Sequence, residues 1–107
     1  MYAVQYDGRV RRWLVTEIAD LDLASIGAAG SLEATVPVPG ARPGDLVVAT
    51  IHGRLNAADS PTTNTASVNA RVSAADVVTL HFVNNSSVAI DPQNNLTGTV
   101  AVLTSVP

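Results

Sequence analysis

The sequence predicts an all-β protein: a small antiparallel β-sandwich or jelly roll of seven to eight short strands, with an N-terminal arm or hairpin. Apolar and polar residues alternate with a period of two in several short stretches, whereas the helical period is almost absent. Glycine, proline, asparagine and aspartate separate these stretches. Small aliphatic side chains supply the interior, since 47% of the residues are hydrophobic but only 4% are aromatic. Such side chains suit a pleated sheet.

The first element is expected to be a hairpin, because Asp7-Gly8 separates two β-prone stretches. Residues 77–83 form the clearest strand, with Leu80 and Phe82 on the same side of the alternation. Seven or eight strands are expected, at residues 2–6, 9–18, 31–38, 46–52, 66–72, 77–83, 88–90 and 96–106.

Three stretches carry more specific expectations. In residues 31–38, Pro37 lies on the polar side of the alternation, which indicates an edge strand or the frayed end of the strand. Residues 46–52 begin with an unbroken apolar run, which indicates a strand buried on both faces. The most polar stretch, residues 53–65, is predicted to be a long surface loop, either an interaction site or a disordered segment.

The chain of 107 residues fits one domain, which we divide into an N-terminal arm or hairpin (1–19) and a β-sandwich (20–107). Folding a chain of this size buries roughly 65% of the unfolded surface, enough for a single core. There are no cysteines, which excludes disulfides and thiolate metal sites. No apolar run is long enough for a transmembrane helix. Residues 1–13 lack an apolar signal core, so export by a signal peptide is not expected.

Composition argues against catalysis and against several kinds of partner. The net charge of −3, with six Arg and no Lys, makes nucleic-acid binding by the whole chain unfavourable, and no membrane partner is expected. His52 and His81 both fall in expected strands and outside any catalytic motif. Asp20 and Asp22 could share one face of a strand near a Ca²⁺ ion, but they lack calcium-loop spacing and are more simply a solvated edge. We therefore expect no catalytic residue, no cofactor and no metal, and predict that the protein is not an enzyme.

Basic and aromatic residues are concentrated near the N-terminus. Arginine and tryptophan are enriched at the centres of protein interfaces, so this cluster could dock on an acidic partner surface. A hairpin with exposed arginines and a buried tryptophan explains the same residues, and nucleic-acid binding by this patch alone is a weaker third reading. The candidate partner-binding residues are Tyr2, Tyr6, Arg9, Arg11, Arg12 and Trp13.

Most of the chain resembles a recurrent small β-domain of tailed-bacteriophage virion proteins. The first matching segment contains VPVPGARPGD, and the second contains VSAADVVTLHF and AIDP; these are similar to VPGAxxGD, VSAANTVTV and AIDP in that family. The resemblance covers roughly residues 20–102 and rests on turns and alternating strands. The closing turn at residues 91–98 departs from the family's pattern and reads DPQNNLTG.

The resemblance implies a virion component and brings no catalytic residues with it. It leads us to expect a head decoration (cement) protein on the capsid surface, made in the bacterial host cytoplasm. Its expected partners are the major capsid protein and further copies of itself, with a trimer favoured. A tail, collar or fibre-associated structural protein is the alternative within this class. A small module that binds carbohydrate or a host surface is the alternative from another class, and the scarcity of aromatic residues argues against it.

Overall fold

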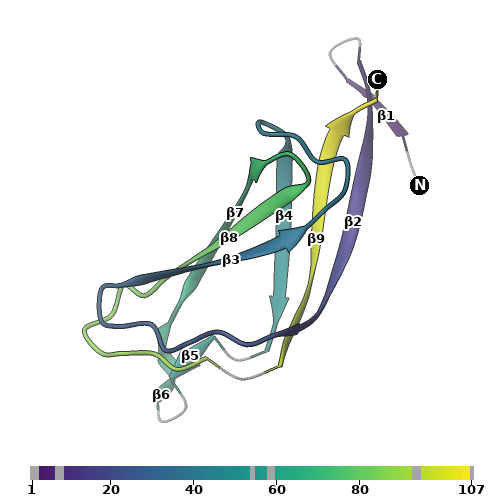
Figure 1. Ribbon diagram of the computed structural model, residues 1–107. Helices are drawn as coiled ribbons and strands as arrows, with labels where there is room; N and C mark the ends of the chain where they lie inside the picture. The colour runs from purple at the N-terminus through teal and green to yellow at the C-terminus, as the bar shows by residue number, and fades with distance from the viewer. Residues whose placement is uncertain (1–2, 7–8, 54, 58–59, 93–94, 107) are drawn as a thin grey trace.

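The computed structural model describes residues 3–6, 9–53, 55–57, 60–92 and 95–106. These residues form strands and connecting turns, and no helix is present among them, so the predicted all-β class is confirmed (Figure 1). The described strands are β1 (Ala3–Tyr6), β2 (Arg9–Leu21), β3 (Ser31–Pro37), β4 (Leu46–His52), β5 (Asn56–Ala57), β6 (Ser60–Thr65), β7 (Ser67–Ala74), β8 (Val77–Val83) and β9 (Leu96–Ser105).

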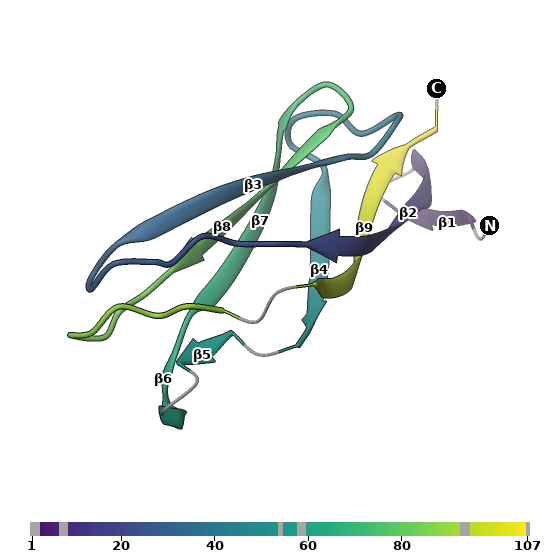
Figure 2. The same cartoon turned by 60° about the horizontal axis from the view of Figure 1, so that its bottom comes forward.

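The strands pair into two main sheets, and every described pairing is antiparallel. One sheet has the order β1-β2-β9-β4 and the other the order β3-β8-β7, while β5 and β6 form a separate two-stranded ribbon. β4 lies next to β7 across the gap between the two main sheets, so the sheets approach each other along this side. In Figure 1 the four-stranded sheet lies behind and to the right of the shorter three-stranded one, and Figure 2 shows the three-stranded sheet at the left and the four-stranded sheet at the right.

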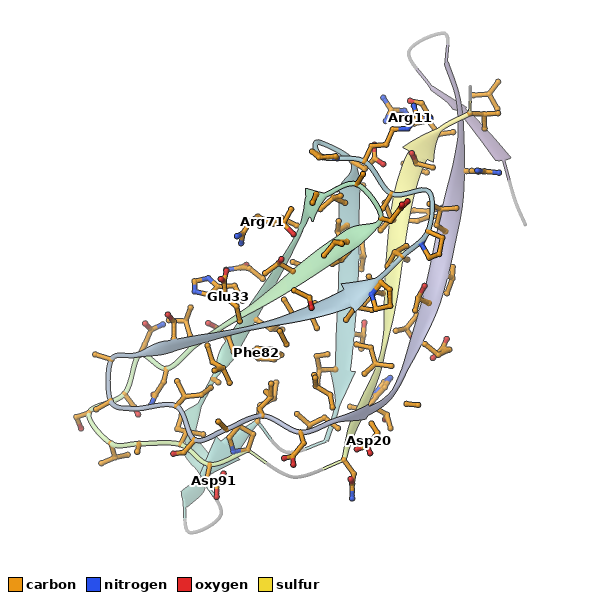
Figure 3. The ribbon with its side chains drawn as sticks, in the orientation of Figure 1. Arg11, Asp20, Glu33, Arg71, Phe82 and Asp91 are labelled. Carbon is orange, nitrogen blue, oxygen red and sulfur yellow. The ribbon has the colours of Figure 1, made fainter. Side chains whose placement is uncertain are left out.

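Alternation along the strands builds the core between the two sheets. β8 is the centre of the three-stranded sheet, and its Val78, Leu80 and Phe82 are fully buried. β9 supplies Val100 and Val102 from the facing sheet, and these belong to the same apolar cluster. Figure 3 shows Phe82 between the two sheets. Each sheet therefore stabilises the fold through one face only, the inner one.

Six strands enclose this core: β2, β9 and β4 on one side, and β3, β8 and β7 on the other. The predicted seven to eight strands were therefore too many for the core itself. One expected strand, residues 88–90, makes only an isolated bridge between Ile90 and Ile26. This short segment has no neighbouring strand long enough to extend the pairing.

The sequence led us to expect a long surface loop at residues 53–65, but this stretch contains two paired strands. β5 and β6 pair within it, with Asn56 opposite Thr65 and Ala57 opposite Ser60. The amide of Ala66 then donates a 2.9 Å hydrogen bond to the carbonyl of Leu55, which closes the ribbon against the start of β7. The polar composition misled the prediction, because two strands can satisfy their backbone hydrogen bonds by pairing without any apolar alternation.

The edge assignment of residues 31–38 is confirmed. β3 is an outer strand of its sheet, and Pro37, which has no amide hydrogen to donate, lies at its end opposite Val77. A central strand donates backbone hydrogen bonds to neighbours on both of its sides, so a proline there would leave a carbonyl unpaired. An edge strand has a neighbour on one side only and tolerates proline. The sequence also predicted a hairpin at the N-terminus, and the antiparallel pairing of β1 with β2 agrees with that prediction.

Two polar side chains hold the turns: Asn84, which is buried, and Asp76, which is exposed. Asn84 is fully buried, and its Nδ2 donates to the carbonyl oxygens of Ile26, Gly27 and Val88 at 3.1, 3.0 and 2.8 Å. Its Oδ1 accepts hydrogen bonds from the amide and the hydroxyl of Ser86. Such a fully satisfied amide ties the chain after β8 to the segment before β3, because the buried polar atoms of Asn84 would be unpaired without these bonds.

The second anchor joins the turn between β7 and β8 to the loop that follows β3. Asp76 adopts a positive φ of 65°, and its carboxylate accepts a 2.7 Å hydrogen bond from the amide of Gly40. Its backbone also bonds Val38 and Ala41, both at 2.9 Å. Aspartate tolerates this left-handed conformation better than most residues, which suits it to the position.

The molecule is elongated, with principal extents of 49 × 23 × 21 Å. The β1–β2 hairpin and the end of β9 project beyond the three-stranded sheet, as Figures 1 and 2 show. β2 runs from Arg9 to Leu21 with a register irregularity between Ile18 and Leu21. The division into an arm and a domain after residue 19 stays a prediction, and β2 extends on both sides of that position.

Candidate functional site

The outer side of the four-stranded sheet carries the candidate site. In an antiparallel sheet, directly paired residues point to the same face. Trp13 pairs with Leu103, and Leu103 also pairs with Leu46, so these three side chains form one row across the sheet. The next row, two residues further along each strand, is formed in the same way. We call this surface the outer apolar face, defined by Trp13, Leu103 and Leu46 in the first row and Val15, Ala101 and Val48 in the second.

This face is open to solvent in the isolated chain. Val15 is 60% exposed, Leu46 56% and Val48 52%, while Trp13 and Leu103 are half-buried. The prediction that β4 is buried on both faces was therefore wrong for the single chain. Its alternate residues pack on the core, but no described segment of the chain covers the other face.

Charged residues of opposite sign lie at the two ends of the apolar rows on β2. Arg11 precedes the first row and pairs with Ser105, and Glu17 follows the second row and pairs with Thr99. The hydroxyl of Thr99 donates a 3.0 Å hydrogen bond to the Glu17 carboxylate, which fixes the acid on this face. Along β2 the face thus runs from a positive end, through the apolar rows, to a negative end.

The outer side of the three-stranded sheet has a contrasting chemistry. Most of its exposed positions are occupied by polar and charged side chains, while Val77 and Val83, at the two ends of β8, are half-buried there. Arg71 and Glu33 form an ion pair at 3.2 Å, visible in Figure 3, and the hydroxyls of Ser73 and Thr79 share a 2.6 Å hydrogen bond. We call this surface the outer polar face, defined by Glu33, Thr35, Asn69, Arg71, Thr79 and His81.

The structure separates the predicted partner-binding residues. Arg11 and Trp13 occupy positions on the outer apolar face, whereas Arg12, between them, has the opposite orientation that strand alternation requires. The Arg12 guanidinium lies near the Gly40 turn and Leu14, and its Nε is buried with no hydrogen-bond partner among the described residues. Three adjacent residues therefore do not form one docking patch.

The remaining members of the predicted set are described only in part. Tyr2 lies outside the described residues. Tyr6 and Arg9 pair with each other at the end of the β1–β2 hairpin, and their side chains lie outside the description. Partner binding by these three residues stays a prediction.

Sequence reasoning missed most of the outer apolar face. Leu46, Val48 and Leu103 received no functional role, because the unbroken apolar run in β4 was interpreted as burial inside the chain. The sequence did contain a signal for this face, namely three apolar runs: the one in β4, residues 13–15 and residues 100–103. Only the register, which brings these distant segments side by side, turns the combination into a surface.

The predicted absence of reactive sites can be compared with the described residues. They contain no group of three or more His, Asp or Glu residues placed to hold a metal ion. His52 is exposed on edge strand β4, and His81 is half-buried on the outer polar face. No helix capable of crossing a membrane is found in the described part of the chain.

The structure defines a class of protein: an all-β domain with one apolar and one polar outer sheet face. An apolar sheet face of this extent is typical of a surface for association with another macromolecule. Comparisons with protein families, curated proteins and solved structures find no match to this chain.

Proposed function

We propose that this protein is a structural component of a tailed-bacteriophage particle, a decoration protein that binds the outer surface of the head and acts by association rather than catalysis. The proposal includes a specific fold: the two main sheets pack as a β-sandwich, with the β1–β2 hairpin as a projecting end. The observation that carries the proposal is the outer apolar face, with Val15, Leu46 and Val48 each more than half exposed on a rigid sheet.

Exposed apolar rows on regular strands favour a role in assembly for a physical reason. Removing apolar surface from water stabilises a contact in proportion to the area covered, and a flat sheet needs little rearrangement to make it. A shell repeats its binding site many times, so an oligomer that engages two or more sites gains avidity without a large individual interface. A small domain can therefore bind a particle firmly.

The two segments that resemble phage virion domains are joined in the structure, which supports treating them as one unit. Residues 31–37 of the first segment pair along their length with residues 77–83 of the second. Ile26 and Ile90 exchange two backbone hydrogen bonds at 2.7 and 2.9 Å, and the buried Asn84 amide donates to Ile26. The matched turns and strands therefore lie side by side instead of being scattered over the fold.

The projecting end of the molecule is the part that we assign to contact with the major capsid protein. The amide of Val106 donates a 2.8 Å hydrogen bond to the carbonyl of Val10, and both side chains are exposed. This end lies beyond the three-stranded sheet, so a shell can reach it without disturbing the core (Figure 2). The predicted residues Tyr6 and Arg9 belong to the same hairpin.

The test is binding to empty heads assembled from the major capsid protein of the same phage. We expect saturable co-sedimentation with the heads and regular added density on their outer surface in electron micrographs. A Val10→Asp variant should bind more weakly, and Ser67→Asp, at an exposed position of the three-stranded sheet, is the matched control. Tagged protein found on tails and never on heads would replace this assignment with the tail or fibre alternative. Absence from both would overturn the virion role.

A further inference from the structure

The charges on β2 are placed symmetrically about the apolar rows. Arg11 lies three residues before Leu14 and Glu17 three residues after it, and both belong to the outer face with Trp13 and Val15. The two apolar rows also lie on either side of Leu14, since the first contains Trp13 and the second contains Val15. Reversing the direction of the strand therefore exchanges the positive end with the negative end and one apolar row with the other.

We propose that the outer apolar face is covered by a second copy of this chain, packed face to face about a two-fold axis that runs across the strands. This inference deepens the proposed function, on which it rests for its setting in the particle, by naming the surface that joins the subunits. Each row of one subunit then faces the other row of its partner. Arg11 of each subunit faces Glu17 of the partner subunit at both ends of β2.

A different direction of the axis does not give this match. An axis parallel to the strands would lay β2 over β4 of the partner, because these strands flank β9 on opposite sides. Glu17 would then approach the row of Thr50, and Arg11 would lie beyond the first residue of β4, which is Leu46. Only the axis across the strands brings opposite charges together while the apolar rows are covered.

The arrangement also agrees with the dimensions of packed sheets. Face-to-face sheets lie about 10 Å apart with strands inclined by about 30°, which leaves room for leucine, valine and tryptophan side chains between them. A two-fold contact of this kind is closed, because each subunit uses the same surface. Both outer polar faces remain on the outside of the pair, where Glu33 and Arg71 stay in water.

The first experiment measures self-association by sedimentation velocity over a concentration series of the full chain. We expect a reversible dimer. Val15→Lys and Val48→Lys should each weaken the dimer by about 100-fold, since a charge is then buried at the centre of the contact. Thr35→Lys on the outer polar face is the matched control and should leave the dimer unchanged. Circular dichroism and thermal unfolding verify that each variant is folded.

The second experiment tests the direction of the axis by exchanging charges. Arg11→Glu alone and Glu17→Arg alone each place like charges together at both ends, and each should weaken the dimer by about tenfold. An equimolar mixture of the two variants should restore association as a heterodimer, because every facing pair is again of opposite sign. The double variant R11E/E17R should also recover the dimer. A loss of folding or a local structural role would not be rescued by mixing.

The outcomes separate this inference from the proposed function. A monomer at high concentration, a trimer, or a dimer that is insensitive to Val15→Lys and Val48→Lys would overturn the two-fold contact. Failure of the mixed variants to associate would overturn it as well. A charge-rescued dimer that binds neither heads nor tails would support the contact and overturn the virion role.

Discussion

The two main sheets use the same alternation on their inner faces but differ on their outer ones. In the three-stranded sheet, the outer positions of β8 between its ends are Thr79 and His81, and the neighbouring strands add an ion pair. In the four-stranded sheet, the outer positions at the centre of β9 are Ala101 and Leu103, and the neighbouring strands add valine, leucine and tryptophan. One face is suited to water and the other to a partner.

This difference shows that folding and association are separate demands on the same strands. The inner positions must be apolar in both sheets, because together they form the core. The outer positions are free of that demand, so their chemistry reflects what lies outside the chain. Apolar side chains at exposed sheet positions contribute little to folding of the single chain, and their burial becomes favourable when another surface covers them.

The largest expected effect comes from a substitution in the core, which both sheets share. Phe82→Ala removes the largest fully buried side chain from the core beneath the two sheets. We expect the free energy of unfolding to fall by about 3–5 kcal/mol, because the lost apolar contacts are compounded by a cavity. Urea unfolding followed by circular dichroism measures this change. A loss below about 1 kcal/mol would mean that the sheets are not held together by this core.

A second substitution weakens the sheet that carries the outer polar face. Asn84→Ala removes the buried amide that bonds Ile26, Gly27 and Val88 and that joins the segment before β3 to the chain after β8. We expect a destabilisation of about 2–3 kcal/mol in urea unfolding. Asn69→Ala, at an exposed position of the same sheet, is the control and should change stability by less than about 0.5 kcal/mol. Equal effects for the two variants would contradict the anchoring role of Asn84.

A third substitution acts on the sheet that carries the outer apolar face. A Cβ atom at Gly98 would collide with the carbonyl oxygen of Thr50 and lie 3.2 Å from Cδ1 of Ile51. Because the obstacle is backbone, Gly98→Ala should destabilise the fold by about 1–3 kcal/mol. Hydrogen exchange should show the loss of protection first between β9 and β4. Protection lost first in β3 and β8 would contradict this localisation.

The smallest expected effect concerns the ion pair on the outer polar face. Arg71 and Glu33 side chains are 59% and 54% exposed, so water and salt screen their attraction. A double-mutant cycle with Arg71→Ala and Glu33→Ala should give a coupling of less than about 1 kcal/mol. Thermal unfolding of the original protein, the two single variants and the double variant, at low and at high salt, measures this coupling energy. A coupling above this value would indicate that the face is shielded from solvent.

Local sequence patterns predicted much of the fold, because strand formation and inward orientation depend on neighbouring residues. The alternation of residues 77–83 gave both the strand and its buried side, and Pro37 gave an edge. Predictions failed where local pattern and environment diverge. The β5–β6 ribbon pairs through its backbone although its sequence is polar, and the open face of β4 has the composition of a buried one.

The candidate site was predictable only in part. The concentration of arginine and tryptophan in residues 9–13 drew attention to β2, and Trp13 does lie on the outer apolar face. The alternation of the predicted strand at residues 9–18 already implies that Arg12 is directed to the other side of the sheet from Arg11 and Trp13. The prediction missed this because it treated adjacent residues as one patch.

By itself, the sequence determined that this chain forms short strands around one aliphatic core, because the period of its apolar residues is a local property that each strand carries alone. Only the tertiary structure decided which surfaces remain open. Leu46, Trp13 and Leu103 become neighbours through the pairing of β4 and β2 with β9, and that pairing joins segments from the two ends and the middle of the chain. A surface built from three distant strands exists only once their register is fixed.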